Sequence, residues 1–299
     1  MKYHPTKKHF YIIQREKMKK PTSINLGLAS EGFMMACKAR RLSVHTIADY
    51  NNTIKKFIGY VGDLPMRDVT TSLVARFLAS LPHSAKTVLN YHVGLAAFWT
   101  WALKEEYVDR HIIRLVDKPR PKKVVIKPFV LTEVLALLNA LRNNRLRDRT
   151  IIYLLLDTGM RASELIGIMR EDIDLVGRKI KVIGKGNKER FIPFSPKTAS
   201  VLLKYLSSLT DNKIFPITRT GLRLLMLRLG KRASIPGCYP HRFRHTFAIN
   251  YLRNGGDPYT LQEILGHTTM DMVRRYLHIA EVDLERAHRK ASPVENWNL

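Results

Sequence analysis

A short stretch near the middle of the chain, residues 116–123, has no place in a folded core and divides the sequence into two parts. It holds two prolines and four cations but hardly any core-forming residue. Such a composition is typical of a semi-rigid, solvated connector. The 299 residues also exceed the length of one ordinary domain. We therefore expect two domains, each large enough to bury its own core, joined by a linker over residues 117–127.

The first part, residues 21–116, has apolar residues at helical spacing in four successive segments. Serine and threonine residues precede these segments, as expected of helix caps. The caps are predicted at residues 21–23, Ser43, Thr70 and Ser84. The pattern predicts an all-helical domain.

The second part, residues 128–285, mixes helical patterns with one predicted hairpin. Thr132 is expected to cap the first of its helices, with Glu133 in the first turn. Residues 179–193 form two short strand-like runs around a glycine-bearing turn, which is typical of a β-hairpin. One more helix is expected over residues 281–287. This part is predicted to be mainly helical with a small sheet.

The chain is strongly basic, with 51 Lys and Arg against 25 Asp and Glu, a net charge of +26 and a pI near 10.2. Divided after Lys127, the first part has 23 basic and 9 acidic residues (+14), and the remainder has 28 and 16 (+12). Residues 1–20 alone carry seven Lys or Arg, which indicates a basic N-terminal arm. A polyanion, and first of all nucleic acid, is the expected partner. A basic surface that serves only solubility is the alternative.

The number of cysteines and the hydropathy of the sequence indicate the cellular compartment of the protein. Cys37 and Cys238 are the two cysteines of the sequence, so no disulfide framework is implied. The N-terminus lacks the apolar run of a secretory signal, and no segment approaches membrane-spanning length. We expect a cytoplasmic protein with no membrane association.

Arg161 is predicted to lie where two helices meet. The apolar run 151–156 indicates a buried helix that Gly159 ends, and a second helix begins a few residues later. A planar guanidinium beside helix ends can contact two phosphate oxygens, and Glu164 can hold it in place. An ordinary surface Arg–Glu pair on a helix is the alternative.

Lys185 lies between two glycines, Gly184 and Gly186, at the turn of the predicted hairpin. Glycines let the backbone approach a ligand closely, and a lysine near a phosphate can donate a proton to a departing 5′-oxygen. A solvated turn and a nucleotide-binding loop are the alternatives. The second lacks the spacing and the Lys-Ser/Thr ending of a phosphate-binding loop.

Two histidines and an arginine follow in the last third of the chain. His241 and Arg244, three residues apart, share one face near the start of a predicted helix, where the helix dipole favours an anion. Gly266 is expected to end a short helix, which leaves His267 just beyond its C-terminus and able to donate a hydrogen bond into the same pocket. A zinc site of His241, His245 and His267 is the alternative, but the sequence has no cysteine pair and no His-Glu-x-x-His.

Tyr276 lies next to the core face of a further predicted helix, which carries Val273 and Leu277. Tyrosines at such positions are usually core residues with a satisfied hydroxyl. A phenol among cations and a histidine, however, suits attack on a phosphodiester, because the positive groups hold the phosphate as its charge rises. The alternatives for Tyr276 are therefore a core residue and a nucleophile.

Taken in order, these groups resemble the tyrosine recombinase (integrase) family in type, order and approximate spacing. The resemblance extends over residues 21–285 and rests on the motifs Thr-Gly-Met-Arg-x-Ser-Glu-Leu, Gly-Lys-Gly-Asn-Lys-x-Arg and His-x-x-Arg-His-Thr. It implies a multi-domain fold, in which an all-α SAM-like core-binding domain and a mainly α catalytic domain with a small β-hairpin form a C-shaped clamp on DNA. Phe243 replaces the leucine that usually precedes the second arginine, a conservative core change.

The resemblance also implies a role for each group. The catalytic positions are Arg161, Lys185, His241, Arg244, His267 and Tyr276. Tyr276 would attack the scissile phosphate to give a 3′-phosphotyrosyl bond and a free 5′-hydroxyl. The two arginines and His267 would stabilise the transition state, and Lys185 would protonate the leaving oxygen. His241 would assist the phenol as acid or base, and Glu164 would support the first arginine.

The implied substrate is double-stranded DNA with specific recombination sites. A homotetramer on two sites, with a dimer on each, would exchange strands through a Holliday junction. No cofactor or metal is implied, because the covalent bond preserves the energy of the broken phosphodiester. The C-terminal tail, residues 286–299, is expected to dock on a neighbouring protomer, with Trp297 as its anchor unless that ring folds back on its own chain.

Further cations are expected to contact DNA: Lys118, Arg120, Lys122, Lys123, Lys188 and Arg190. For the linker cations, an exposed connector without a DNA contact is an equal alternative. The implied activity is site-specific recombination, for integration, excision or resolution of a mobile element or of DNA dimers. The alternatives are a type IB topoisomerase and a nonenzymatic DNA-binding regulator.

Overall fold

The structure, a computed structural model, divides into two compact units, residues 1–124 and 125–299. The division falls within the stretch predicted as a linker. The residues that the structure describes are 24–122, 125–141, 145–184, 189–280, 288 and 291–297. Several predictions fall outside them: the basic arm, the extra helix over 281–287, Lys123, Lys185 and Lys188.

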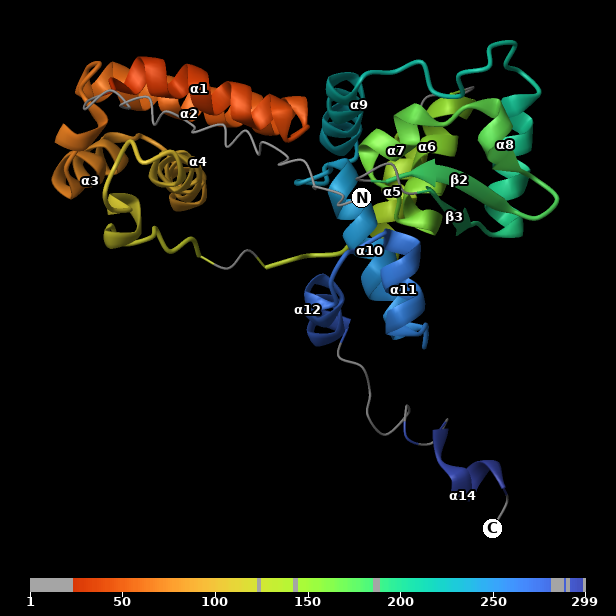
Figure 1. Cartoon of the computed structure of the whole chain (residues 1–299). Helices are drawn as coiled ribbons and strands as arrows, with labels where there is room; N and C mark the ends of the chain where they lie inside the picture. Colours follow the sequence, from red (N-terminus) through yellow and green to blue (C-terminus); the bar gives the residue numbers. More distant parts are fainter. Residues whose placement is uncertain are drawn as a thin grey trace, which may run out of the picture. The chain divides into compact units, whose positions relative to one another are not determined.

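The described part of the first unit is helical throughout (Figure 1). Its elements are α1 (Leu26–Ala39), α2 (Val44–Val61), η1 (Met66–Asp68), α3 (Thr71–Ser80), α4 (Ala85–Lys104) and η2 (Ile112–Leu115). Ser43, Thr70 and Ser84 cap α2, α3 and α4 as predicted, each accepting the N–H three residues on. The start of α1 was predicted too early, because its N-cap is Asn25, whose side chain makes no capping bond.

The core of the first unit is rich in aromatic rings. Trp99 and Phe57 are both fully buried and meet edge to face, with 6.0 Å between ring centroids. Phe33 and Phe98 lie 5.4 Å apart in the same core. The helical spacing read from the sequence therefore places these rings on the faces of α1, α2 and α4 that meet in the core. The predicted all-helical domain is confirmed.

The second unit combines helices with one small antiparallel sheet. Its first elements are α5 (Leu131–Asn139), α6 (Leu146–Thr158), α7 (Ala162–Gly167), η3 (Arg170–Asp172), β1 (Ile173–Asp174), β2 (Lys179–Ile183) and β3 (Glu189–Pro193). They are followed by α8 (Pro196–Leu206), α9 (Arg219–Arg232), α10 (Pro240–Arg253), α11 (Pro258–Leu265), α12 (Asp271–Ala280) and α14 (Pro293–Asn296). The strand order is β1-β2-β3. The hairpin is confirmed, and β1 adds a strand that the sequence did not predict.

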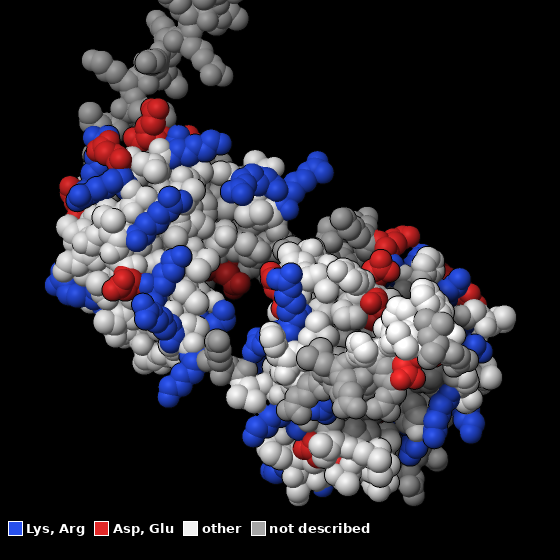
Figure 2. All heavy atoms as spheres, turned by 90° about the horizontal axis from the view of Figure 1, so that it is seen from below, with Lys and Arg blue, Asp and Glu red and all other residues white. Residues whose placement is uncertain are grey.

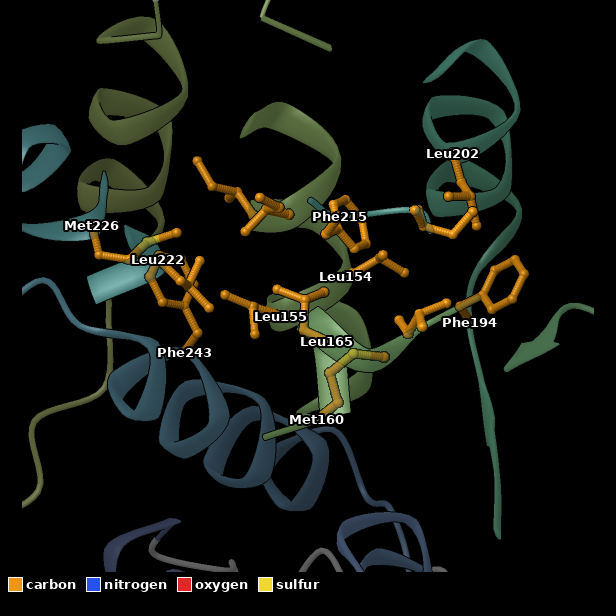
Figure 3. Packing of buried hydrophobic residues seen from close by; sticks show 14 of the residues in the cluster. Leu154, Leu155, Met160, Leu165, Phe194, Leu202, Phe215, Leu222, Met226 and Phe243 are labelled. Carbon is orange, nitrogen blue, oxygen red and sulfur yellow. The ribbon is translucent and has the colours of Figure 1, made fainter. Parts of the chain in front are cut away.

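Buried side chains from most of these elements meet around α6 (Figure 3). Leu154 and Leu155 of α6 are fully buried, and α6 packs against α8 and α10. The helix ends at Gly159, whose φ of +60° is left-handed, and a Cβ there would collide with the ring of Phe247. The close packing of α10 against the end of α6 therefore requires glycine at this position.

The start of α5 corrects one prediction. Thr132 was expected to cap this helix, but α5 begins at Leu131, and the carboxylate of Glu133 accepts the backbone N–H of Val130 at 3.1 Å. The same carboxylate accepts from Arg242 of α10 at 2.8 Å. The predicted position of Glu133 in the first turn is confirmed. Glu133 thus caps α5 and, through its hydrogen bond from Arg242, connects α5 to α10.

A separate apolar cluster holds α10, α11 and α12 together. It includes Ile249, Leu261 and Val273, all fully buried. Because α10 packs directly on α12, residues about 30 positions apart in the sequence become neighbours. This cluster fixes the helix that carries Tyr276.

The surface carries many of the basic side chains that the composition predicts. Figure 2 shows Lys and Arg side chains spread over the face in view of each unit. Both cysteines are buried and free. Within the described parts of the chain, no helix has the length and apolar character needed to cross a membrane.

Candidate active site

Arg161 lies at the N-terminus of α7, just beyond the glycine that ends α6. Its Nη1 donates to Glu164 Oε1 at 2.8 Å, and its backbone N–H donates to Glu164 Oε2 at 2.7 Å. Its Nη2 donates to the Gly266 carbonyl at 3.0 Å. The side chain of Arg161 is 36% exposed, so the guanidinium is held from one side and open to a ligand from the other.

Arg190 of β3 completes this cluster. Its Nη1 and Nη2 each donate to one oxygen of Glu164 at 2.9 Å, and its Nε donates to the Ile264 carbonyl at 2.9 Å. Its side chain is only 14% exposed. The guanidinium of Arg190 is thus engaged inside the unit, where it holds Glu164 and, through it, Arg161. The DNA contact expected of Arg190 stays a prediction.

The carboxylate of Glu164 is kept ionised by these partners. Burial raises the pKa of Glu164, but hydrogen bonds from Arg190 and Arg161 and the charge of Arg190 outweigh burial, and the pKa is lowered. Glu164 is thus a fixed negative charge shared by two arginines.

Arg244 of α10 is almost completely buried, with 1% exposed. Its Nη1 donates to the Gly159 carbonyl at 2.9 Å, and its Nη2 donates to the Leu265 carbonyl at 2.7 Å and lies 2.8 Å from His267 Nε2. Because a guanidinium only donates, Nε2 of His267 must accept, and the proton of this ring is on Nδ1. His267 was expected to donate a hydrogen bond into the pocket. Its Nε2 accepts from Arg244, which leaves Nδ1–H as its donor, and a donation to a ligand stays a prediction.

Two buried nitrogens of this pair, Nε of Arg244 and Nδ1 of His267, have no hydrogen-bond partner among the described residues. Unpaired buried donors are costly, and a phosphate oxygen is a suitable acceptor for them. Burial lowers the pKa of Arg244 to about 10, with a further contribution from Arg161. Burial and the charge of Arg244 lower the pKa of His267 to about 4. At neutral pH the pocket therefore holds cationic arginines and a neutral imidazole.

Tyr276 of α12 is fully buried, and its Oη lies 2.9 Å from Nδ1 of His245 on α10. Burial raises the pKa of the phenol, and the charges of Arg244, Arg275 and Arg161 lower it by less. The hydroxyl therefore lies within the electrostatic reach of the arginines and is protonated at neutral pH. The ring of Tyr276 is therefore a core residue, while the role of its hydroxyl as a nucleophile stays a prediction.

His241 lies at the first turn of α10, exposed to solvent. Its ring centroid is 4.3 Å from that of His245, one helical turn further on. Partial burial and the charges of Arg244 and Arg161 lower the pKa of His241. It was predicted to assist Tyr276, but His245 is the histidine that contacts the phenol. This contact was not predicted from the sequence, although His245 belongs to the His-x-x-Arg-His-Thr motif.

A cavity of about 870 Å³ adjoins Arg161 and His241. Arg219 and Arg223, one turn apart on α9, line its other side and are exposed. Neither was singled out in the sequence. The cavity thus brings Arg161 together with a second pair of arginines, as a groove that follows a nucleic-acid backbone requires.

For the remaining predicted residues, the structure gives only their exposure or does not describe them. Lys118, Arg120 and Lys122 are exposed, which agrees with either alternative for the linker, so their DNA contact stays a prediction. Lys185 lies outside the described residues, in the sequence between the end of β2 and the start of β3. Among the described residues, no cluster of His, Cys, Asp and Glu has the geometry to hold a metal ion.

Comparisons with known proteins bear on the family and on the fold. Residues 129–282 match the phage integrase family, and residues 33–106 match the phage integrase N-terminal SAM-like domain. The tyrosine recombinase XerD of Staphylococcus haemolyticus is 32% identical to this chain over 276 residues, which cover 84% of the chain and 94% of that protein.

Two solved structures share the fold. A lambda integrase dimer bound to a COC′ core site has a TM-score of 0.74 at 20% identity, covering 85% of this chain and 77% of that chain. A lambda integrase tetramer bound to a Holliday junction has a TM-score of 0.73 at 19% identity, with the same coverage of both chains. The family matches and the XerD relative show that this chain belongs to the phage integrase family of tyrosine recombinases.

Proposed function

We propose that this chain is a site-specific DNA recombinase that cuts and rejoins strands through a covalent bond to Tyr276. One observation carries the proposal: the buried hydroxyl of Tyr276 lies in the field of Arg161 and Arg244, and Nε of Arg244 has no partner among the described residues. A nucleophile beside preorganised cations suits a phosphodiester whose charge rises in the transition state.

The arginines have separate parts in the proposed reaction. Arg161 presents an open side of its guanidinium while Glu164 holds the other, so it can bind a non-bridging phosphate oxygen without moving. Arg244 is fixed by two carbonyls and offers Nε. His267 joins them through its unpaired Nδ1–H. The attack by Tyr276 forms the O–P bond and breaks the bond to the 5′-oxygen.

Lys185 is the proposed general acid for that 5′-oxygen. In the sequence it falls between β2 and β3, and Arg190, near the start of β3, donates hydrogen bonds to Glu164. The turn end of strand β3 is thereby joined to the residue that holds Arg161. His241, exposed at the mouth of the pocket, is proposed to assist proton transfer to and from the phenol.

We extend the proposal to the assembly. Four protomers would join two DNA sites, a dimer on each, and integration, excision or dimer resolution would follow from how the sites are arranged. The lambda integrase tetramer on a Holliday junction supports this assembly. The tail would dock on a neighbouring protomer, which agrees with the exposure of Val294 (58%) and Trp297 (71%). The cytoplasm is the proposed compartment because the DNA substrate lies there.

The test begins with DNA sites that the full chain selects from a randomised duplex library. On a nicked suicide duplex of a selected site, the wild-type chain should form a covalent adduct that Tyr276→Phe does not form. Two separate duplexes carrying the site should give joined recombinant products. Relaxation of plasmid without joining would favour a topoisomerase, and site-specific binding without any adduct would favour a nonenzymatic regulator.

A further inference from the structure

His245 makes a contact with the nucleophile that the proposed roles leave unexplained. Its Nδ1 lies 2.9 Å from Oη of Tyr276, and the two rings meet edge to face with 5.6 Å between centroids. His245 is 9% exposed and Tyr276 is fully buried. The hydrogen bond therefore lies in a protected part of the site, on the reacting atom itself.

The direction of this hydrogen bond follows from the surroundings. Within the described residues, no other partner of Tyr276 Oη is found. If Nδ1 of His245 carried a proton and donated it, the phenol proton would be buried without an acceptor, which is costly. If the phenol donates, both groups are satisfied, and the imidazole carries its proton on Nε2. The phenol is therefore the donor.

We propose that His245 is the catalytic base that takes the phenol proton of Tyr276 as its Oη bonds to phosphorus. In this step the Oη–P bond forms, the bond from phosphorus to the 5′-oxygen breaks, and the proton moves from Oη to Nδ1 of His245. The departing 5′-oxygen receives its proton from the general acid. Rejoining runs the same transfers in reverse. This inference rests on the proposed function and names a residue that the six catalytic positions omit.

Burial and the charges around His245 keep its imidazole neutral and able to accept a proton. His241 and Arg244 face it from α10, and Arg275 and Tyr276 face it from α12. Burial, followed by the charges of His241, Arg275 and Arg244, lowers the pKa of His245 to about 4. The imidazole is therefore neutral, and free to accept, over the whole range in which the chain would act.

The same low pKa makes His245 a weak base until DNA is bound. A phosphodiester brings negative charge into the pocket, and nearby negative charge favours the protonated imidazole. Proton transfer from Tyr276 is thus coupled to DNA binding, and the free chain keeps its phenol protonated. His241, with its ring centroid 4.3 Å from that of His245 and its edge in solvent, offers a route by which the proton can leave.

The test separates a base from a group that merely positions the phenol. His245→Asn places an amide near the position of Nδ1, so it can keep a hydrogen bond to Tyr276 but cannot take a proton. His278→Asn, an exposed histidine of α12, is the matched control. Single-turnover cleavage of the nicked duplex is measured from pH 6 to 10, with DNA binding and thermal unfolding measured alongside.

The base hypothesis predicts a specific pH profile. Cleavage by His245→Asn should be about 100-fold slower than wild type near pH 7, and its rate should rise about tenfold per pH unit as the phenolate fraction grows. The wild-type rate should be far less dependent on pH over the same range. Replacing Tyr276 with a fluorinated tyrosine of lower pKa should restore cleavage in the His245→Asn background. A sulfur leaving group at the 5′ position, which relieves the general acid, should not.

Two results would overturn the inference. One is wild-type cleavage by His245→Asn at all pH values. The other is a defect of constant size across pH that fluorinated tyrosine does not relieve, as a positioning role predicts. If the wild-type chain itself forms no adduct that depends on Tyr276, the proposed function fails instead, so the two failures are distinguishable.

Discussion

Replacing Glu164 with glutamine removes a carboxylate that two arginines share. Its oxygens accept from Arg161 Nη1 at 2.8 Å, from the Arg161 backbone at 2.7 Å and from both terminal nitrogens of Arg190 at 2.9 Å. The Glu164 side chain is 3% exposed. Glutamine keeps the size but brings an NH₂ group against these N–H donors. Glu164→Gln therefore leaves two guanidinium groups without their shared counter-charge.

The expected cost follows from burial. Breaking a buried ion pair by removing one partner costs about 3–5 kcal/mol. Because Arg161 is 36% exposed and water can replace part of its pairing, we expect the low end, about 3 kcal/mol of unfolding free energy. Arg161 also loses one of the two hydrogen bonds to Glu164 that orient it, because glutamine keeps only one accepting oxygen. A displacement of its guanidinium by about 1 Å would slow cleavage up to about 100-fold.

Urea unfolding of Glu164→Gln, Arg190→Met and the double variant tests this account. Circular dichroism follows both units. In a Trp297→Phe background, the fluorescence of Trp99 and Trp101 follows the first unit and serves as an internal control. The double variant should recover about 2 kcal/mol relative to the sum of the single losses, because it leaves no unpaired Arg190, yet its cleavage should stay slow. Losses that add within about 0.5 kcal/mol would refute the shared pair.

Further outcomes follow from the same geometry. Gly266→Ala should cost about 1 kcal/mol or more by chemical denaturation and should slow cleavage, because φ is +61° at this position and a Cβ would lie 2.9 Å from Cζ of Arg190. Alanine at both Arg219 and Arg223 should reduce the slope of log affinity against log salt by about 0.9 per lost phosphate contact, with no loss of thermal stability. Since the pKa of Glu164 is lowered, its stabilising contribution is present above the ordinary carboxyl pKa and is lost as the pH falls through the folded-state pKa. Acid unfolding of Glu164→Gln should lack that loss.

Local signals in the sequence were enough to predict most of the helices. Ser43, Thr70 and Ser84 cap helices as predicted, because a side-chain oxygen before an apolar repeat satisfies a backbone N–H whatever the tertiary context. Gly159 and Gly266 end helices in left-handed conformations that few other residues adopt. The fold of the catalytic unit around Arg161 and Arg244 depends on these helix ends.

The contact between His245 and Tyr276 was not predictable from local pattern. The two residues lie on helices that tertiary packing brings together, and helical spacing from His241 says nothing about what lies opposite. Arg190 did carry a signal. It is two residues before the buried Ile192 on a strand, so the period of two places its side chain on the inner face, where a cation must be paired.

The measurement that tests the central claim most directly is peptide mapping of the covalent adduct. The full chain is trapped on a nicked suicide duplex, the DNA is trimmed with nuclease, and the modified peptide is sequenced by tandem mass spectrometry. We predict a nucleotide joined through its 3′-phosphate to Oη of Tyr276, and no adduct from Tyr276→Phe. An adduct on any other residue, or one that persists in Tyr276→Phe, would contradict the assignment of the nucleophile.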